Sequence, residues 1–157
     1  MKRSLLLLLA LTSLLTGLYA QNRTKLSGEE QAIKDVIENE SKYFWARDYK
    51  NWKKTWVQED YILRTVATRD GVHQVVGWKD WNAEVRQLFE ESPEPQEYNV
   101  RKYDYTFHLF GNCAWVTFWQ DTGTLSRELR IMEKHKGKWQ IAMLEAIYNS
   151  GEAPSGD

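Results

Sequence analysis

The strongest constraint on the fold is a long alternation of apolar and polar residues in the second half of the chain. It covers residues 98–148 and is rich in aromatic and β-branched side chains, as is typical of strands with one buried face. Three turn signals interrupt it: Gly111-Asn112, Asp121-Thr122-Gly123 and His135-Lys136-Gly137. Because turns of this length join antiparallel neighbours, the sequence predicts a meander of four strands.

The first half of the chain begins with helical patterns. Residues 27–30 have the serine and glutamate spacing of a capping box, and apolar residues follow at helical intervals as far as Phe44. Asp48 is expected to cap a short second helix that carries Trp52 and Trp56. Two helices therefore precede the first strand.

A hairpin and a third helix lie between these helices and the meander. Residues 61–68 and 72–76 are rich in β-branched side chains and flank the turn at residues 69–71, which predicts a pair of strands. Residues 78–90 have helical periodicity and end before two prolines, which cannot continue a helix. Helices followed by a curved antiparallel sheet indicate an α+β fold.

Residues 1–20 have the pattern of a secretory signal peptide. Lys2 and Arg3 precede an apolar run over residues 5–15, and the small residue Ala20 ends the segment. The run is shorter than the roughly 20 apolar residues that span a bilayer, so we expect cleavage after Ala20, with an uncleaved anchor as the alternative. The only cysteine, Cys113, lies far from the run, which argues against a lipoprotein.

The remaining chain has the usual size of one domain. We expect this domain at residues 21–149, and a disordered tail at residues 150–157 because they are small and polar. The mature protein is expected to be secreted or periplasmic, with no membrane attachment. Without Lys2 and Arg3, the 21 basic residues fall to 19, against 22 acidic ones, so we expect no nucleic-acid partner.

The sequence indicates neither a metal site nor a cofactor site. The histidines His73, His108 and His135 are scattered and lack the paired spacing of zinc ligands. No Gly-x-Ser-x-Gly motif and no glycine-rich phosphate loop is present. Cys113 could act as a nucleophile only with a base such as His108, and a structural thiol is the simpler interpretation. We therefore expect no metal and no cofactor.

The last hairpin carries two charges inside apolar runs, Arg130 and Glu145. A two-residue turn would set Glu128 opposite Glu145, which is repulsive, and it would require a positive φ at Lys136. A three-residue turn instead sets Arg127 opposite Glu145. We therefore predict the three-residue turn and an Arg127–Glu145 pair.

Combining the three hairpins predicts that Arg130 lies on the opposite face from Glu145. Ala114 is expected opposite Arg130, and Val116 opposite Glu128. A buried guanidinium without a partner costs several kcal/mol, so Arg130 must find Glu128, a helix carboxylate such as Glu40, water or an anionic ligand. A structural ion pair in a filled core and a polar anchor in a cavity both remain open.

Glu40 is the one charged member of the apolar stripe on the first helix. Ile33 and Ile37 precede it at helical spacing. Two interpretations are open: a carboxylate at the edge of the stripe that reaches water, and a carboxylate that points into a cavity.

These residues resemble the nuclear transport factor 2-like superfamily, in particular its SnoaL-like and kinase-association-domain-like branches. The resemblance covers residues 29–148. It rests on the order and spacing of five segments: Arg47-Asp48-Tyr49-Lys50-Asn51-Trp52, Gly77-Trp78, Gly111-Asn112-Cys113-Ala114-Trp115-Val116, Arg130-Ile131-Met132 and Gly137-Lys138-Trp139-Gln140-Ile141.

The resemblance implies a cone-shaped α+β fold, also called cystatin-like, in which N-terminal helices pack on a strongly curved antiparallel sheet around a cavity. In kinase-association-like members, an arginine matching Arg130 faces that cavity and helps to hold small carboxylates. Further cavity arginines of that branch would fall near Gln120 and Ala146, and this chain lacks both. The resemblance therefore implies a weaker or different anion site here.

The leading functional hypothesis is a secreted, dimeric domain that binds a small, partly apolar molecule of unknown identity. The candidate ligand-binding residues are Arg130, Glu128, Glu40, Trp56, Tyr61, Trp81, Tyr105, Phe118 and Met132.

Two alternatives belong to other functional classes. The first is an enzyme of the isomerase or cyclase type, with Glu40 or Asp60 as general base and Tyr61 or Tyr105 as the opposing donor; no catalytic residue is assigned beyond these candidates. The second is a non-catalytic interaction module. In the leading hypothesis and in this module, a homodimer is expected through the other sheet face, and its candidate interface residues are Trp115, Trp119, Leu129 and Met143.

Overall fold

The computed structural model describes residues 25–148. The signal peptide predicted at residues 1–20 and the tail predicted at residues 150–157 lie outside the described residues, and the single domain at residues 21–149 stays a prediction. The chain divides into two compact units, one ending at Gln31 and the other beginning at Ala32. Each unit is described separately below.

The described part of the first unit holds the start of helix α2 (Gly28–Trp45). The backbone N–H of Ser27 donates to Glu30 Oε2 at 2.7 Å, and the backbone N–H of Glu30 donates to Ser27 Oγ at 3.2 Å. These two reciprocal bonds satisfy donors that a helix N-terminus leaves free. The predicted capping box is confirmed.

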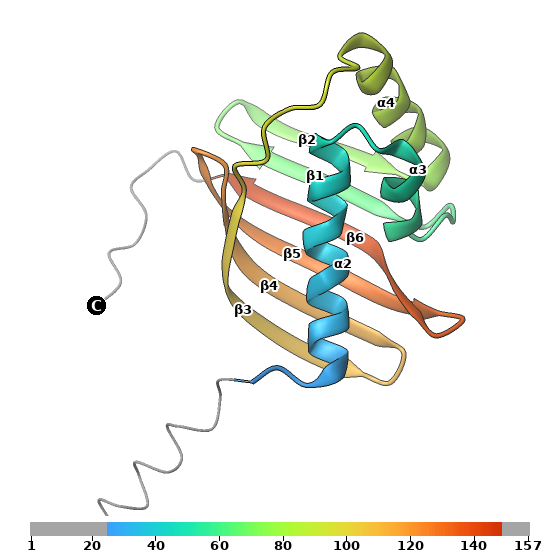
Figure 1. Ribbon diagram of the computed structural model, residues 1–157, viewed down its shortest axis with the longest axis vertical. Helices are drawn as coiled ribbons and strands as arrows, with labels where there is room; N and C mark the ends of the chain where they lie inside the picture. The colour runs from blue at the N-terminus through green and yellow to red at the C-terminus, as the bar shows by residue number, and fades with distance from the viewer. Residues whose placement is uncertain (1–24, 149–157) are drawn as a thin grey trace, which may run out of the picture. The chain divides into compact units, whose positions relative to one another are not determined.

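The second unit contains the remainder of α2, two further helical elements, a fourth helix and six strands (Figure 1). In chain order they are α3 (Tyr49–Trp52), η1 (Lys53–Thr55), β1 (Leu63–Thr68), β2 (Gly71–Val76), α4 (Trp78–Glu91), β3 (Arg101–Phe110), β4 (Cys113–Asp121), β5 (Leu125–His135) and β6 (Lys138–Tyr148).

The second helix is shorter than predicted. Asp48 caps it as expected, because its Oδ1 accepts the backbone N–H of Asn51 at 3.1 Å. After Trp52 the chain tightens into the 3₁₀ turn η1, and Trp56 is extended and forms an isolated bridge to Ile141. Trp52 and Trp56 therefore do not share one helix.

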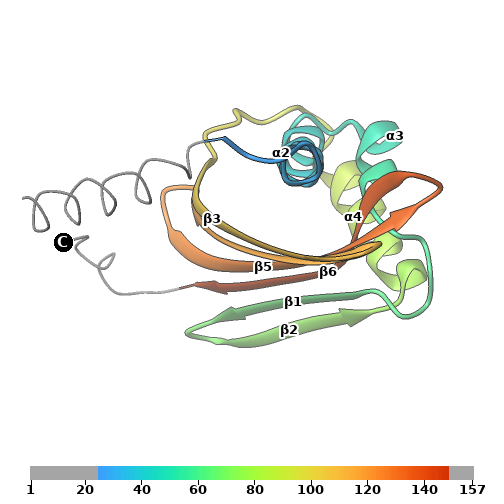
Figure 2. The ribbon, with the colours of Figure 1, turned by 90° about the horizontal axis from the view of Figure 1, so that it is seen from below.

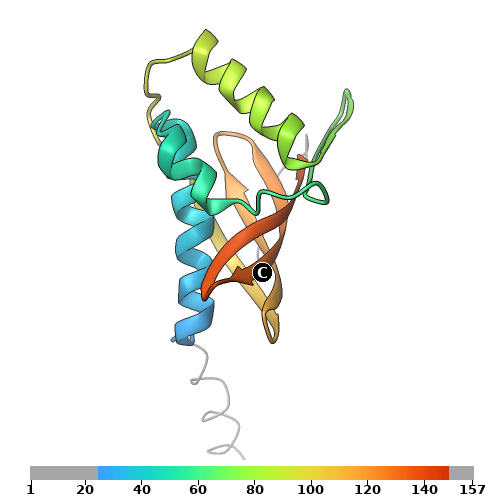
Figure 3. The same ribbon diagram turned by 90° about the vertical axis from the view of Figure 1, so that its right-hand side faces the viewer.

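The strands form one six-stranded sheet in the order β2-β1-β6-β5-β4-β3. All neighbours are antiparallel except β1 and β6, which are parallel, so the sheet is mixed rather than purely antiparallel as predicted. Figure 2 shows that the sheet curves towards the side on which α2 lies. Helix α4 follows β2 and lies beside the β1–β2 hairpin (Figure 3). This arrangement creates a space bounded by α2, α4 and the inner sheet face.

Four of the eight tryptophans are buried in the core, as expected of large aromatic side chains. Trp52 and Trp56 have no exposed surface. Trp52 contacts Trp56, Trp78 and Trp81 with ring centroids 5.7–6.3 Å apart. This aromatic cluster packs α3 and η1 against α4.

The β3–β4 hairpin has the predicted register near its turn. Leu109 pairs with Ala114, and Phe107 pairs with Val116. Further along, a bulge between Tyr103 and Thr106 shifts the ladder by one residue. Tyr103 therefore lies opposite Trp119 and is 37% exposed.

The register between β4 and β5 differs from the prediction by two residues. The turn is Thr122-Gly123-Thr124, since Asp121 pairs with Leu125. Arg130 therefore lies opposite Val116, and Glu128 lies opposite Phe118. Because side chains alternate with a period of two, a shift of two leaves each of them on its predicted face.

The predicted register between β5 and β6 is wrong. The turn has only two residues, Lys136 and Gly137, with φ values of +50° and +79°, so a lysine adopts the left-handed conformation that two-residue hairpins require. A bulge between Ile131 and Met132 then displaces the ladder. Glu145 consequently lies opposite Leu129 instead of Arg127.

The extra residue of this bulge is Ala142, because Ile131 pairs with Met143 whereas Met132 pairs with Ile141. Ile141 and Ala142 are consecutive and both buried. The bulge also places Glu128 opposite Ala146, which avoids the Glu128–Glu145 repulsion expected of a two-residue turn. On the turn side of the bulge, Trp139 and Ile141 are both buried.

Candidate functional site

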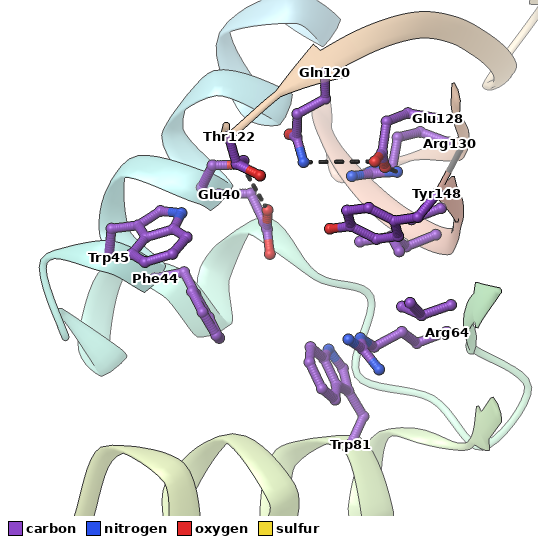
Figure 4. A pocket seen from close by; sticks show the side chains of 14 residues that line it. Glu40, Phe44, Trp45, Arg64, Trp81, Gln120, Thr122, Glu128, Arg130 and Tyr148 are labelled. Atoms are coloured by element: carbon purple, nitrogen blue, oxygen red, sulfur yellow. Dashed lines mark hydrogen bonds and ion pairs between the residues drawn. The ribbon is translucent and has the colours of Figure 1, made fainter. Parts of the chain in front are cut away.

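A cavity of about 260 Å³ opens between the inner sheet face, α2 and α4 (Figure 4). Its charged and amide-bearing lining residues are Glu40, Arg64, Gln120, Glu128 and Arg130. Its aromatic lining residues are Phe44, Trp45, Trp81 and Tyr148. The site therefore combines aromatic walls with a few polar groups, as small-molecule sites usually do.

The pairing of neighbouring strands places two arginines in one row. Arg64 on β1 lies opposite Leu144 on β6, and Leu144 lies opposite Arg130 on β5. Strands lie about 4.8 Å apart, so the two arginine backbones flank Leu144 about 10 Å from each other. Both side chains line the same cavity.

Arg130 is held by its neighbour two residues earlier on β5. It is 2% exposed, and its Nη1 donates to Glu128 Oε2 at 2.8 Å and to the carbonyl oxygen of Leu129 at 3.1 Å. Its guanidinium also lies 5.2 Å from the ring centroid of Phe118. The Arg130–Glu128 pair, one of the partners considered from the sequence, is present.

Glu128 is the hub of this polar group. It is 1% exposed and also accepts bonds from Ser126 Oγ and, at 3.4 Å, from Gln120 Nε2. Ser126 and Gln120 pair across β5 and β4, so the ladder brings all three side chains to the cavity end of the sheet. The hydrogen bonds hold the Glu128 carboxylate towards Arg130.

Glu40 is a buried carboxylate that lines the cavity. It is 6% exposed, Trp52 Nε1 donates to its Oε1 at 3.1 Å, and Ser41 Oγ donates to its Oε2 at 3.3 Å. Among residues 25–148 it forms no ion pair, and in particular none with Arg130. Glu40 is thus buried against the cavity and does not reach water at the edge of the apolar stripe.

Arg64 lies on the other side of the cavity, against α4. Its guanidinium is 4.6 Å from the ring centroid of Trp81, and no ion pair to it occurs within the described part of the chain. Burial lowers the pKa of Arg64, while the charges of Glu84 and Glu40 act in the opposite direction. Arg64 is therefore a partly buried cation held by an aromatic ring.

Three buried polar atoms of the lining lack a hydrogen-bond partner among the described residues. They are Arg130 Nε, Trp81 Nε1 and Gln120 Oε1. Leaving such an atom unsatisfied costs roughly 1–3 kcal/mol. The only other such side-chain atom described is Trp56 Nε1, which belongs to a core residue outside the cavity lining. Two donors and one acceptor on residues that line this cavity are thus left unsatisfied by the described part of the protein.

The structure brings four of the nine candidate ligand-binding residues together in this cavity: Glu40, Trp81, Glu128 and Arg130. Trp56, Phe118 and Met132 are fully buried in the core and do not line it. Phe118 instead contacts the Arg130 guanidinium through its ring, as described above.

The candidate tyrosines and Asp60 lie elsewhere. Tyr105 donates its hydroxyl proton to Glu38 at 2.7 Å, and Tyr61 is exposed and donates to Glu133 at 2.8 Å. Asp60 is exposed and lines a separate hollow beside the start of α4. Glu40 is therefore the only one of the two proposed bases that reaches the cavity.

Sequence reasoning missed Arg64 and Tyr148. Arg64 had a visible signal, because it is a charged residue inside an apolar strand, as Arg130 is. Its place in the site depends on the parallel pairing of β1 with β6, which local patterns do not reveal. Tyr148 reaches the cavity because the Ala142 bulge places it opposite Ser126.

Two further findings bound the chemistry of the described residues. No group of three or more histidine, cysteine, aspartate or glutamate side chains within residues 25–148 is arranged to hold a metal ion. In the same range, no helix is long and apolar enough to cross a membrane.

The fold matches that of several solved proteins. No family model and no curated protein matches the chain. An NTF2-like protein of unknown function from Shewanella baltica aligns with a TM-score of 0.60 at 13% identity, over 82% of this chain and 100% of that one. An NTF2-like protein from Cytophaga hutchinsonii aligns with a TM-score of 0.61 at 14% identity, over 79% and 100%. This chain has the nuclear transport factor 2-like fold.

A third similar structure, from Nostoc punctiforme, is a protein of unknown function with a cystatin-like fold, with a TM-score of 0.59 at 10% identity over 82% of this chain and 97% of that one. The predicted α+β fold of NTF2-like or cystatin-like type is thus confirmed. At these identities the likeness shows the fold alone. Function must be argued from the cavity, because one fold serves many chemistries.

Proposed function

We propose that this NTF2-like domain binds a small, partly apolar molecule in the cavity beside Arg130. The observation that carries the proposal is the buried Nε of Arg130, which has no partner among residues 25–148 although Nη1 of the same side chain is fully engaged. A ligand acceptor at this atom would remove the cost of a buried, unsatisfied donor. Trp81 Nε1 offers a second donor of the same kind.

The dimensions and walls of the cavity support a small ligand. Its volume of about 260 Å³ lies just below the roughly 300–1,000 Å³ typical of drug-sized ligands. Phe44, Trp45, Trp81 and Tyr148 supply aromatic surface, on which an apolar ligand body would pack. We therefore propose a metabolite-sized ligand with an apolar part and at least one hydrogen-bond acceptor.

Binding can be tested by tryptophan fluorescence, since Trp45 and Trp81 line the cavity. A panel of small aromatic and aliphatic acids, alcohols, amines and amino acids would be titrated into the protein. We expect quenching by at least one compound, with one molecule bound per chain. Failure of the whole panel to bind would refute the proposal.

The matched variant is Arg130→Lys, which keeps a positive charge for Glu128 but removes the Nε donor. We expect it to weaken binding about tenfold, the loss of one good hydrogen bond. Arg127→Lys is the control, because Arg127 belongs to the same strand but points to the outer face, where it donates to Thr117 Oγ1 at 2.8 Å. Equal effects of the two substitutions would contradict the assignment of Arg130.

A catalytic function of the isomerase or cyclase type is the second candidate. Glu40 lines the cavity, and Figure 4 shows the Tyr148 hydroxyl pointing towards it from β6. Burial raises the pKa of Tyr148, so its hydroxyl stays a donor at neutral pH. Both carboxylate oxygens of Glu40 already accept a hydrogen bond from the protein, from Trp52 Nε1 and Ser41 Oγ, and no donor among the described residues is bonded to Glu40 from across the cavity. Binding is therefore the function that the geometry supports better.

We also propose that the protein is exported and dimeric. Export rests on the signal-peptide pattern of residues 1–20. Dimerisation rests on the outer sheet face, where Trp115 is 39% exposed and Leu129 and Met143 are partly exposed, because exposed apolar patches often mark interfaces. Light scattering of the mature chain tests the second point.

A further inference from the structure

Two opposite charges of the cavity lack an ionic partner within the described residues. Glu40 accepts hydrogen bonds only from the neutral donors Trp52 Nε1 and Ser41 Oγ. Arg64 lies on the ring of Trp81 and forms no ion pair in residues 25–148, although the charges of Glu84 and Glu40 act on it through space. The other two charges of the lining, Arg130 and Glu128, neutralise each other at 2.8 Å. One negative and one positive charge therefore remain for a ligand.

These two charges occupy different walls. Glu40 comes from α2 and Arg64 from β1, and Figure 4 shows open space between their side chains. Each acts on the other only through that space, since no ion pair joins them in residues 25–148. A buried carboxylate without a counter-ion is costly. A molecule that places a cation near Glu40 and an anion near Arg64 would neutralise both.

The unpartnered polar atoms also include a donor suited to an anion and an acceptor suited to a cation. Trp81 Nε1 is a buried donor on the residue that stacks with Arg64, so it can join Arg64 in holding an anionic oxygen. Gln120 Oε1 is a buried acceptor, so it can take an N–H of a ligand cation. The cavity thus offers partners to both ends of a dipolar molecule and an aromatic surface to its body.

From this juxtaposition we infer that the ligand is a zwitterion with an apolar side chain, in chemical class an amino acid. The inference rests on the proposed binding function and specifies it. The ligand's ammonium group pairs with Glu40, its carboxylate pairs with Arg64 and Trp81 Nε1, and its side chain lies against the aromatic wall. Both charges of such a ligand would be paired when buried. The cavity therefore selects for a ligand that carries both charged groups.

Charge deletion in the ligand and in the protein can be combined in one experiment. The probes are phenylalanine, 3-phenylpropanoate without the ammonium group, 2-phenylethylamine without the carboxylate, and the neutral 2-phenylethanol. Leucine and valine with their acid and amine counterparts form parallel sets. The protein variants are Glu40→Gln, which keeps an oxygen to accept from Trp52 Nε1, and Arg64→Gln. Affinities would be measured by isothermal titration calorimetry.

We expect at least one amino acid to bind about tenfold or more tightly than its acid and amine counterparts, because each lacks one charged contact. Arg64→Gln should weaken binding of the amino acid and the acid about tenfold and leave the amine unchanged. Glu40→Gln should weaken the amino acid and the amine and leave the acid unchanged. This crossed pattern would not arise from a general loss of folding.

Two results overturn the inference in distinguishable ways. If a singly charged or neutral probe binds in the cavity as tightly as every amino acid, the zwitterion is wrong and the proposed binding function stands. If no amino acid binds while another compound of the broader panel does, the conclusion is the same. If nothing in either panel binds, the proposed function fails together with the inference.

Discussion

Replacing Glu128 by glutamine would leave Arg130 as a buried cation without its counter-ion. Arg130 is 2% exposed and Glu128 is 1% exposed, and 2.8 Å separates Arg130 Nη1 from Glu128 Oε2. Removing one partner of such a pair costs about 3–5 kcal/mol. Because whole domains are stable by only about 5–15 kcal/mol, Glu128→Gln should remove about a fifth or more of the free energy of unfolding.

The assay is urea unfolding followed by tryptophan fluorescence, with the midpoint and the slope compared between variants. Asp121→Asn is the control, since it removes the partner of the exposed Arg101 at 2.6 Å, and exposed pairs contribute little. The double variant Glu128→Leu with Arg130→Met should recover most of the lost stability, because an apolar pair leaves no buried charge. A loss below about 1 kcal/mol in Glu128→Gln would refute this account of the pair.

Three smaller perturbations have defined outcomes. Lys136→Asn should raise the melting temperature measured by circular dichroism, because asparagine tolerates the φ of +50° better than lysine; a lower one would contradict the two-residue turn. The bond from Tyr61 to Glu133 raises the pKa of Tyr61 from 10.0 to about 12. The stability that this bond gives the folded protein is complete below pH 10.0 and is lost as the pH rises to about 12. Tyr61→Phe should therefore remove the tyrosine ionisation near pH 12 from an ultraviolet titration. Trp115→Glu should convert a dimer to a monomer in light scattering, and an unchanged mass would exclude the outer face as the interface.

Local patterns predicted the elements and most inner-face residues, since capping, periodicity and turn composition act over a few residues. The capping box at residues 27–30, the Asp48 cap and the inward orientation of Arg130 and Glu128 are examples. The face of each residue on β5 survived a register error of two because the strand period is two. Patterns with a short range were therefore sufficient for the fold class.

Bulges and non-local pairing limited the prediction of the site. The bulge at Ala142 has no local composition signal, yet it determines which residues of β6 face inward. Arg64 enters the site only through the parallel β1–β6 pairing. The left-handed Lys136 shows that tertiary packing can override a turn preference of a single residue. The pattern of the meander predicted two of the four charged lining residues, Glu128 and Arg130. Arg64 could be placed in the site only from the complete sheet.

The most direct test of a binding cavity beside Arg130 uses the side-chain N–H resonances of the protein in solution. Arg130 Nε and Trp81 Nε1 are buried, unpartnered donors in the cavity lining, whereas Trp56 Nε1 is an equally unpartnered donor in a residue outside that lining. During titration with a compound that quenches the tryptophan fluorescence, the Arg130 and Trp81 signals should shift together and saturate, and the Trp56 signal should stay in place. Shifts confined to Trp56, or none at the two cavity donors, would contradict the account.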